Sequence, residues 1–151
     1  MDRVKKYGQK PMLILLTGKT GVDKKTPAKQ LEKELFERGM KTYFLGIGNI
    51  LRGLDSDIAK EDRKEHIRRL GEVVHILLDA GLVVITTASD LTEEEVKMFE
   101  EVSSKEQLLL FTVGKDTLPD YLVNLNLKES GGSIKKIVEY IKSNRMLNGS
   151  K

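Results

Sequence analysis

The stretch from Leu82 to Thr86 constrains the fold more than any other part of the chain. It reads Leu-Val-Val-Ile-Thr, with no alternation of polar and apolar residues. Such short runs are typical of strands that are buried on both faces of a sheet, and sheets of that kind are parallel and covered by helices on both sides. A second run, from Met12 to Leu16, is apolar throughout. We therefore predict that these two runs are interior, adjacent strands of a parallel sheet.

Segments with helical periodicity separate the strand-like runs. Glycines at positions 39 and 81 end the first two such segments, and Thr92-Glu93-Glu94-Glu95 is a capping box that opens the next. Further strands are expected at 41–45, 108–113 and 121–127, with helices over about 28–38, 61–80, 92–102 and after Gly131-Gly132. This order predicts a three-layer α/β/α domain with about five parallel strands. The domain is expected over residues 11–144, between flexible segments at 1–10 and 145–151.

The composition excludes several classes of function. The chain has 151 residues, a net charge of +3 and no cysteine, so disulfides, zinc fingers and thiol catalysis are excluded. Basic residues alternate with acidic ones instead of clustering, which disfavours nucleic acid as a partner. The longest apolar run is far too short to span a bilayer, and the N-terminus does not resemble a secretion signal. We expect a cytoplasmic protein without a membrane or nucleic-acid partner.

The first strand runs into a loop that partly matches a phosphate-binding pattern. Residues 17–26 read Thr-Gly-Lys-Thr-Gly-Val-Asp-Lys-Lys-Thr, and the pattern G-x-x-x-x-G-K-[ST] fits at Gly18 and Lys24. It fails at Asp23, where a glycine lets the backbone approach phosphate. It also fails at Lys25, where a hydroxyl ligates Mg²⁺ and an ammonium cannot. Thr26 followed by proline predicts a helix N-cap at Thr26.

Four segments in order resemble the adenylylsulfate (APS) kinases. They are the loop with its helix (16–35), Asn49-Ile50 with Gly53-Leu54, the Glu-Asp-Arg helix (61–69) and the strand at 80–86. The resemblance implies a P-loop NTPase-like fold and transfer of the γ-phosphate of ATP, with Mg²⁺, to the 3′-hydroxyl of APS. In the loop, the resemblance implies that phosphate or nucleotide is bound by Gly18, Gly21, Lys24 and Thr26. Outside the loop, it implies that substrate is bound by Asn49 and Arg63.

The chain departs from the family pattern wherever the pattern carries catalysis. Gly46-Ile47-Gly48 stands in place of Asp-Gly-Asp, Leu51 in place of a substrate-binding arginine, and His66 in place of an asparagine. A stacking phenylalanine is missing between Asp55 and Glu61. Ala88-Ser89-Asp90-Leu91 replaces Phe-Ile-Ser-Pro, and residues 114–120 are too few for the lid over ATP, so that region is expected to be deleted.

These losses predict a degenerate domain without catalytic residues or a metal site, and with a regulatory, scaffolding or nucleotide-sensing role in sulfate activation. ATP, ADP, phosphate or sulfate would bind weakly. The resemblance also implies homodimers and association or fusion with ATP sulfurylase or its GTPase subunit. The alternative is a residual ATP-dependent kinase acting on APS or another small molecule. A nucleic-acid-binding module is a third possibility, which the alternation of basic and acidic residues disfavours.

Several single residues carry two interpretations each. Lys24 is either a retained phosphate contact or a solvated lysine near a helix start. The arginines at positions 63, 68 and 69 are either inherited nucleotide contacts or a solvated helix face, and the solvated face is favoured for Arg68. His66 and His75 are expected to be surface or boundary residues.

Overall fold

The structure, a computed structural model, describes residues 9–19, 21–46, 63–103, 107–114, 118–127 and 133–143. Several positions that the sequence singles out lie outside the described residues: Ile47, Gly48, Asn49, Leu51, Asp55 and Glu61.

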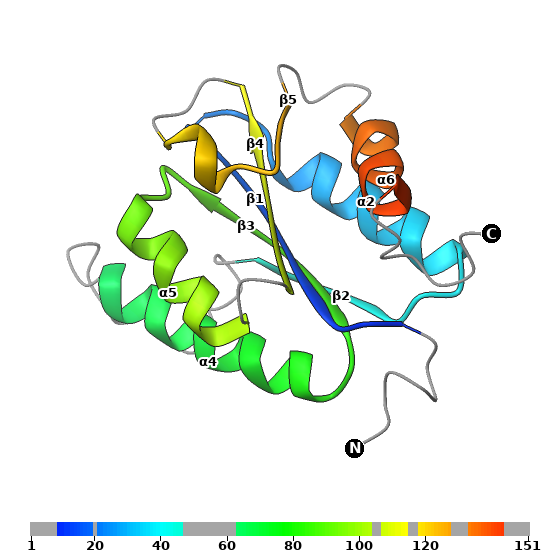
Figure 1. Cartoon of the computed structure of the whole chain (residues 1–151), viewed down its shortest axis with the longest axis horizontal. Helices are drawn as coiled ribbons and strands as arrows, with labels where there is room; N and C mark the ends of the chain where they lie inside the picture. Colours follow the sequence, from blue (N-terminus) through cyan, green and yellow to red (C-terminus); the bar gives the residue numbers. More distant parts are fainter. Residues whose placement is uncertain are drawn as a thin grey trace.

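The described strands form one parallel sheet in the order β2-β3-β1-β4-β5 (Figure 1). Their bounds are β1 Met12–Gly18, β2 Thr42–Gly46, β3 Val83–Ser89, β4 Leu108–Val113 and β5 Leu125–Leu127. Within the sheet Ile14 of β1 lies opposite Ile85 of β3 and Leu109 of β4. The prediction that the two most apolar runs are interior neighbours is confirmed.

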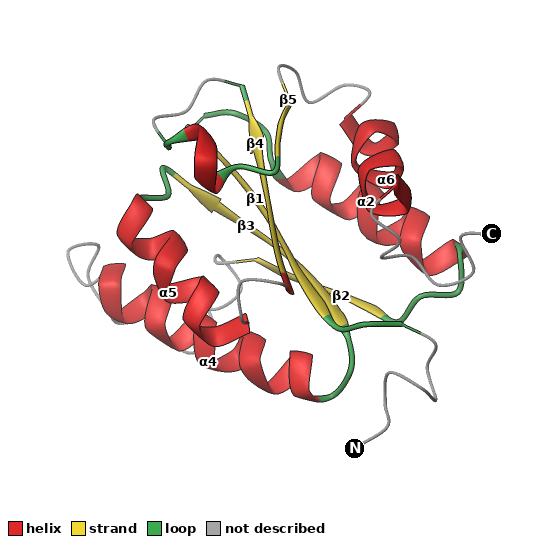
Figure 2. Cartoon of the chain, in the orientation of Figure 1, coloured by secondary structure: helices red, strands yellow, loops and turns green. Residues whose placement is uncertain are grey.

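Helices cover both faces of the sheet, as Figure 2 shows. The helices α2 (Lys25–Glu37) and α6 (Ser133–Ser143) pack on one face, and α4 (Arg63–Asp79) and α5 (Glu93–Ser103) pack on the other. The strands alternate between two cores: Ile14 and Leu16 face α2 and α6, whereas Leu13 and Leu15 face α4 and α5. All four side chains are fully buried, which explains why β1 shows no polar alternation. The fold is the predicted three-layer, P-loop NTPase-like α/β arrangement.

The helix ends follow the local signals in the sequence. Gly39 and Gly81 adopt φ values of 89° and 88° after α2 and α4, a left-handed conformation that a glycine adopts at no steric cost. At α5 the capping box is formed in both directions: Glu95 N donates to Thr92 Oγ1 over 3.1 Å, and Thr92 N donates to Glu95 Oε1 over 3.0 Å. None of the helices in the described part of the chain is long and apolar enough to cross a membrane.

The fifth strand is shorter than predicted. Residues Asp120–Leu122 form a 3-10 helix, η3, and only Leu125–Leu127 pair with β4. The reason is Asn124, whose N–H donates to Leu110 O while its side-chain Oδ1 accepts from Leu110 N, both over 2.8 Å. The amide side chain takes the place of a main-chain carbonyl at the start of the ladder, so the residues before it are free to turn.

One residue of the expected flexible segment 1–10 is buried. Gln9 is 4% exposed, and its Nε2 donates to Lys41 O and Gly81 O while its Oε1 accepts from Lys41 N. It thereby joins the approach to β1 to the starts of β2 and β3. Residues 1–8 lie outside the described part of the chain.

Candidate functional site

The candidate site is the loop between β1 and α2, at the carboxyl end of the interior strand. In open parallel sheets, ligands bind at this edge. A Cβ on Gly18 would lie 2.6 Å from Val113 O of the neighbouring strand, so only glycine fits where the loop leaves β1. Gly21 has a φ of 95°, which turns the loop back toward α2. Both glycines predicted for phosphate binding therefore shape the loop, each for a different steric reason.

Lys24 is folded into its own loop. Its side chain is 7% exposed, and Nζ donates to Lys19 O and Val22 O over 3.0 Å each. Burial lowers the pKa of Lys24, while the nearby charges of Asp90 and, to a smaller extent, Asp23 oppose this shift. The interpretation of Lys24 as a solvated lysine is wrong, because the residue is buried and its ammonium donates to two loop carbonyls.

The N-cap residue of α2 is Lys24, and Asp23, one residue before it, supplies the side-chain hydrogen bond that the sequence assigns to Thr26. The helix α2 begins at Lys25, and Asp23 Oδ1 accepts a hydrogen bond from Thr26 N over 3.1 Å. This N–H is the main reason that the pKa of Asp23 is lowered. Aspartate is among the preferred capping residues because its short side chain reaches the first free amides of a helix. Thr26 thus lies inside the first turn, and the prediction of an N-cap there is wrong.

Asp90 is a further charged residue of this site that the sequence analysis did not assign. It follows β3 directly, has a φ of 53°, and its N–H donates to Gly18 O over 2.8 Å. The signal available in the sequence was an aspartate immediately after a buried strand. A small cavity of about 100 Å³ separates the loop from this turn, and its lining is Thr17, Gly18, Lys19, Asp90, Leu91, Thr92 and Leu118.

Arg63 lies at the start of α4 and reaches across to α5. Its Nε donates to Glu95 Oε2 over 2.8 Å, and its Nη2 donates to Ser89 O over 2.7 Å and to Glu95 Oε1 over 3.2 Å. The proposed substrate contact of Arg63 stays a prediction, as does that of Asn49, which lies outside the described residues.

The two histidines of α4 differ in burial. His66 is 5% exposed, so the prediction of a surface or boundary position is wrong for it. It sits one residue before the buried Ile67 and four before the buried Leu70, a spacing that places it on the packed face of the helix. His66 Nε2 has no hydrogen-bond partner among the described residues. His75 is exposed, as predicted, and its Nδ1 lies 3.3 Å from Val102 O.

The described residues do not fit a magnesium site. Lys25 holds the position where the phosphate-loop pattern has a hydroxyl, and β2 ends in Gly46 where the family has its first aspartate. No group of three or more histidine, aspartate or glutamate side chains comes together within the described ranges.

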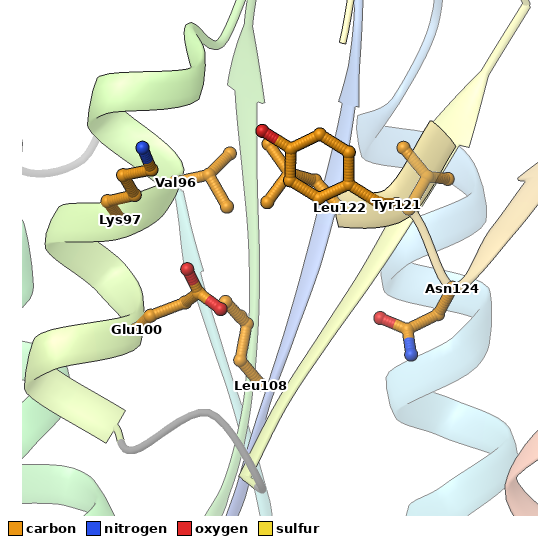
Figure 3. A pocket seen from close by; sticks show the side chains of 8 residues that line it. Val96, Lys97, Glu100, Leu108, Tyr121, Leu122 and Asn124 are labelled. Carbon is orange, nitrogen blue, oxygen red and sulfur yellow. The ribbon is translucent and has the colours of Figure 1, made fainter. Parts of the chain in front are cut away.

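A second cavity, of about 280 Å³, lies between α5 and the chain that connects η3 to β5. Figure 3 shows Lys97 and Glu100 on the α5 side and Tyr121 and Asn124 opposite them. Tyr121 is 74% exposed, and its hydroxyl donates to Glu93 Oε2 over 2.7 Å. This hydrogen bond is the main reason that the pKa of Glu93 is lowered and that of Tyr121 raised. The cavity is separate from the loop.

Comparison with known proteins agrees with the resemblance seen in the sequence. The family model described as adenylylsulphate kinase matches residues 10–129. An adenylyl-sulfate kinase of Shewanella sp. (strain W3-18-1) is 44% identical over 95 residues, which are 62% of this chain and 46% of that protein. One of Klebsiella pneumoniae is 43% identical over 102 residues, 66% of this chain and 51% of that protein. The chain spans about half the length of these curated relatives.

Solved structures show the same relation. An APS kinase of Mycobacterium tuberculosis superposes with a TM-score of 0.72 at 26% identity, covering 89% of this chain and 99% of that one. A hexameric APS kinase from Thiobacillus denitrificans has a TM-score of 0.76 at 16% identity, covering 93% of this chain and 30% of that one, and supports the fold. With the loop, the fold and the family match in agreement, the chain belongs to the adenylylsulphate kinase family.

Proposed function

We propose that this chain is a non-catalytic member of its family that senses nucleotides or related anions in sulfate activation. The observation that carries the proposal is the hydrogen bond from Thr26 N to Asp23 Oδ1. A helix N-terminus favours an anion, and here the carboxylate of the chain itself meets that amide. ATP, ADP, phosphate or sulfate then competes with Asp23 and binds weakly.

The same loop supports the absence of phosphoryl transfer. This reaction depends almost entirely on positioning and on neutralising the charge of the transferred group. Lys24 donates to loop carbonyls, Lys25 brings an ammonium where the metal-binding hydroxyl belongs, and Gly46 brings no carboxylate. Within the described residues, no cluster of three or more histidine, aspartate or glutamate side chains replaces these lost groups. Each loss alone weakens catalysis, and their combination is expected to abolish it.

Calorimetry and a coupled ADP-release assay test this proposal together. We expect weak binding of ATP and ADP that does not depend on Mg²⁺, and no ADP release with APS as acceptor. Lys24→Ala tests the loop itself, and Lys33→Ala, in the helix α2 that follows the loop, is the matched control for loss of one positive charge. Micromolar, Mg²⁺-dependent ATP binding would contradict the proposal, as would turnover that Lys24→Ala abolishes.

Retained kinase activity is the second candidate function. It is favoured by Asp90, whose charge acts on the buried Lys24 and would stand in for a lost carboxylate, and by the 44% identity to adenylyl-sulfate kinases. The ADP-release assay decides between the two candidates, provided that it is repeated with several nucleoside acceptors besides APS.

We further propose that the chain forms homodimers and associates with ATP sulfurylase or its GTPase subunit. The support is the family relation, together with a neighbour described as a hexameric APS kinase. Light scattering coupled to gel filtration would report the assembly state. Co-elution with purified sulfurylase would report the association, and a monomer that elutes separately would refute both parts.

A further inference from the structure

Arg63 is the centre of a polar network that joins three elements. Its guanidinium binds both carboxylate oxygens of Glu95 in α5 and the carbonyl of Ser89 at the end of β3. Glu95 also accepts from Thr92 N in the capping box. The side chain of Arg63 is 38% exposed and that of Glu95 is 11% exposed, so this fork lies at the border of the core, where two-pronged contacts of arginine are strong.

The network ends next to the loop lysine. Ser89 directly precedes Asp90, whose N–H is bonded to Gly18 O and whose charge acts on Lys24. Asp90 has a φ of 53°, a conformation that is costly for a residue other than glycine and persists only where the surroundings hold it. Arg63 on one side and Gly18 O on the other supply those surroundings.

We propose that Arg63 is a positioning residue for the phosphate loop, which holds the Ser89–Asp90 turn so that the Asp90 carboxylate faces Lys24. This role differs from the direct substrate contact that the sequence suggested for Arg63. This positioning role rests on the proposed function only in one respect, the assumption that an anion binds at the loop. The hydrogen bonds from Arg63 to Glu95 and Ser89 form without a ligand.

The consequence can be measured at Lys24 without any ligand. The charges of two carboxylates, Asp90 and to a smaller extent Asp23, act on this ammonium, and both raise its pKa against the effect of burial. Loss of the positive charge of Arg63 would, through space alone, also raise the pKa of Lys24. If Arg63 instead positions Asp90, its loss lets the carboxylate turn away, and the pKa of Lys24 falls. The two mechanisms therefore predict shifts of opposite sign.

The experiment compares Arg63→Met, Asp90→Asn and the double variant by NMR titration of the Lys24 side chain. We expect both single variants to lower the pKa of Lys24, and Arg63→Met to add no further fall once Asp90 is asparagine. Arg63→Lys should behave like Arg63→Met, because an ammonium keeps the charge but cannot bridge Glu95 and Ser89 as the planar fork does. Glu95→Gln is the second variant if Arg63→Met does not fold. Its fall in the pKa of Lys24 should vanish when Asp90 is asparagine, whereas a fall caused through space by the lost charge of Glu95 would persist there.

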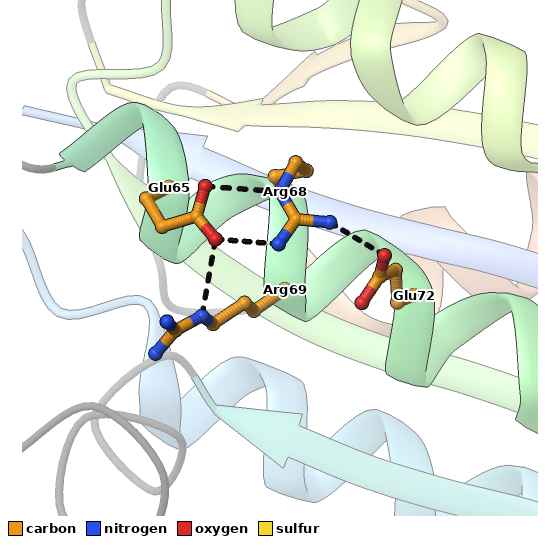
Figure 4. A network of polar contacts seen from close by, with 4 residues as sticks. All are labelled: Glu65, Arg68, Arg69 and Glu72. Carbon is orange, nitrogen blue, oxygen red and sulfur yellow. Dashed lines mark hydrogen bonds and ion pairs between the residues drawn. The ribbon is translucent and has the colours of Figure 1, made fainter.

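Arg68→Met is the matched control. Arg68 lies on the same helix and pairs with Glu65 and Glu72 on its exposed face, as Figure 4 shows. The substitution therefore removes one arginine and its ion pairs without a change at β3. It should leave the pKa of Lys24 unchanged. In the Arg63 variants, a raised or unchanged pKa of Lys24 would overturn the proposal. A fall of the same size with and without the Asp90 carboxylate would overturn it as well.

ADP binding, measured on the same variants, separates this inference from the proposed function. If the unsubstituted protein does not bind ADP, the nucleotide-sensing role fails, while the shift at Lys24 still decides the role of Arg63. If ADP binds and the Lys24 titration is indifferent to Arg63, the positioning role fails alone.

Discussion

Asp23 Oδ1 accepts a hydrogen bond from Thr26 N over 3.1 Å, and this places a carboxylate of the chain at the start of α2. Next to it, Lys24 Nζ is held by the carbonyls of Lys19 and Val22. Two groups that a phosphate would use, the Thr26 amide and the Lys24 ammonium, thus already have partners within the loop. An anion that uses either group would have to replace these contacts.

Repair of the loop should restore binding but not catalysis. Asp23→Gly with Lys25→Ser removes the internal carboxylate and returns a metal-binding hydroxyl, so ATP affinity should rise in calorimetry. APS phosphorylation should stay undetectable, because a nucleotide alone leaves the acceptor without orientation, and orienting both reactants is worth about 7–11 kcal/mol of the barrier. Glu37→Gln with Lys33→Ser, farther along α2, is the control with the same charge changes. Robust kinase activity of the repaired protein would refute the prediction.

Gly18→Ala should destabilise the fold, by about 1–3 kcal/mol in the free energy of unfolding. The added Cβ would meet Val113 O at 2.6 Å, so β1 and β4 would have to separate at the site. Gly46→Ala is the control, since a Cβ there would lie 3.6 Å from the nearest ring carbon of Phe44, an ordinary contact. Urea unfolding of both variants checks this, and equal losses would show that Gly18 is not sterically required.

Thr92→Ala should cost about 1 kcal/mol of stability, because it removes the oxygen that accepts from Glu95 N at the start of α5. Thr92→Ser keeps that oxygen and should lose much less. The comparison is made by thermal or urea unfolding. A serine variant as unstable as the alanine variant would indicate that the methyl group, and not the cap, carries the effect.

Glu65 should titrate far below an ordinary glutamate. Hydrogen bonds from Arg68, and to a smaller extent from Arg69, lower its pKa from 4.5 to about 2 (Figure 4). Because the folded pKa is lowered, the contribution of Glu65 to stability is full above about pH 4.5 and is lost as the pH falls toward 2. Carboxyl NMR should show this midpoint, and Arg68→Met should move it upward. A midpoint near 4.5 in the unsubstituted protein would show that this exposed network does not form in solution.

The polarity of each run was enough to predict the sheet and its helices. Val83, Val84 and Ile85 are all fully buried, and a strand without polar residues has no other place than between two helical layers. Gly39, Gly81 and the Thr92–Glu95 box marked helix ends through contacts within a few residues, which a sequence records directly. The phosphate loop was found for the same reason, since its glycines and Lys24 are neighbours in the chain.

What the tertiary structure alone decided are contacts between residues far apart in sequence. The environment of Lys24 depended on how the loop folds back and on the charge of Asp90. The hydrogen-bond partners of Arg63 are Ser89 and Glu95, which belong to other elements. The late start of β5 depended on the hydrogen bond between Asn124 and Leu110. Periodicity and capping are local, whereas the partner of a polar side chain is set only when distant strands and helices meet.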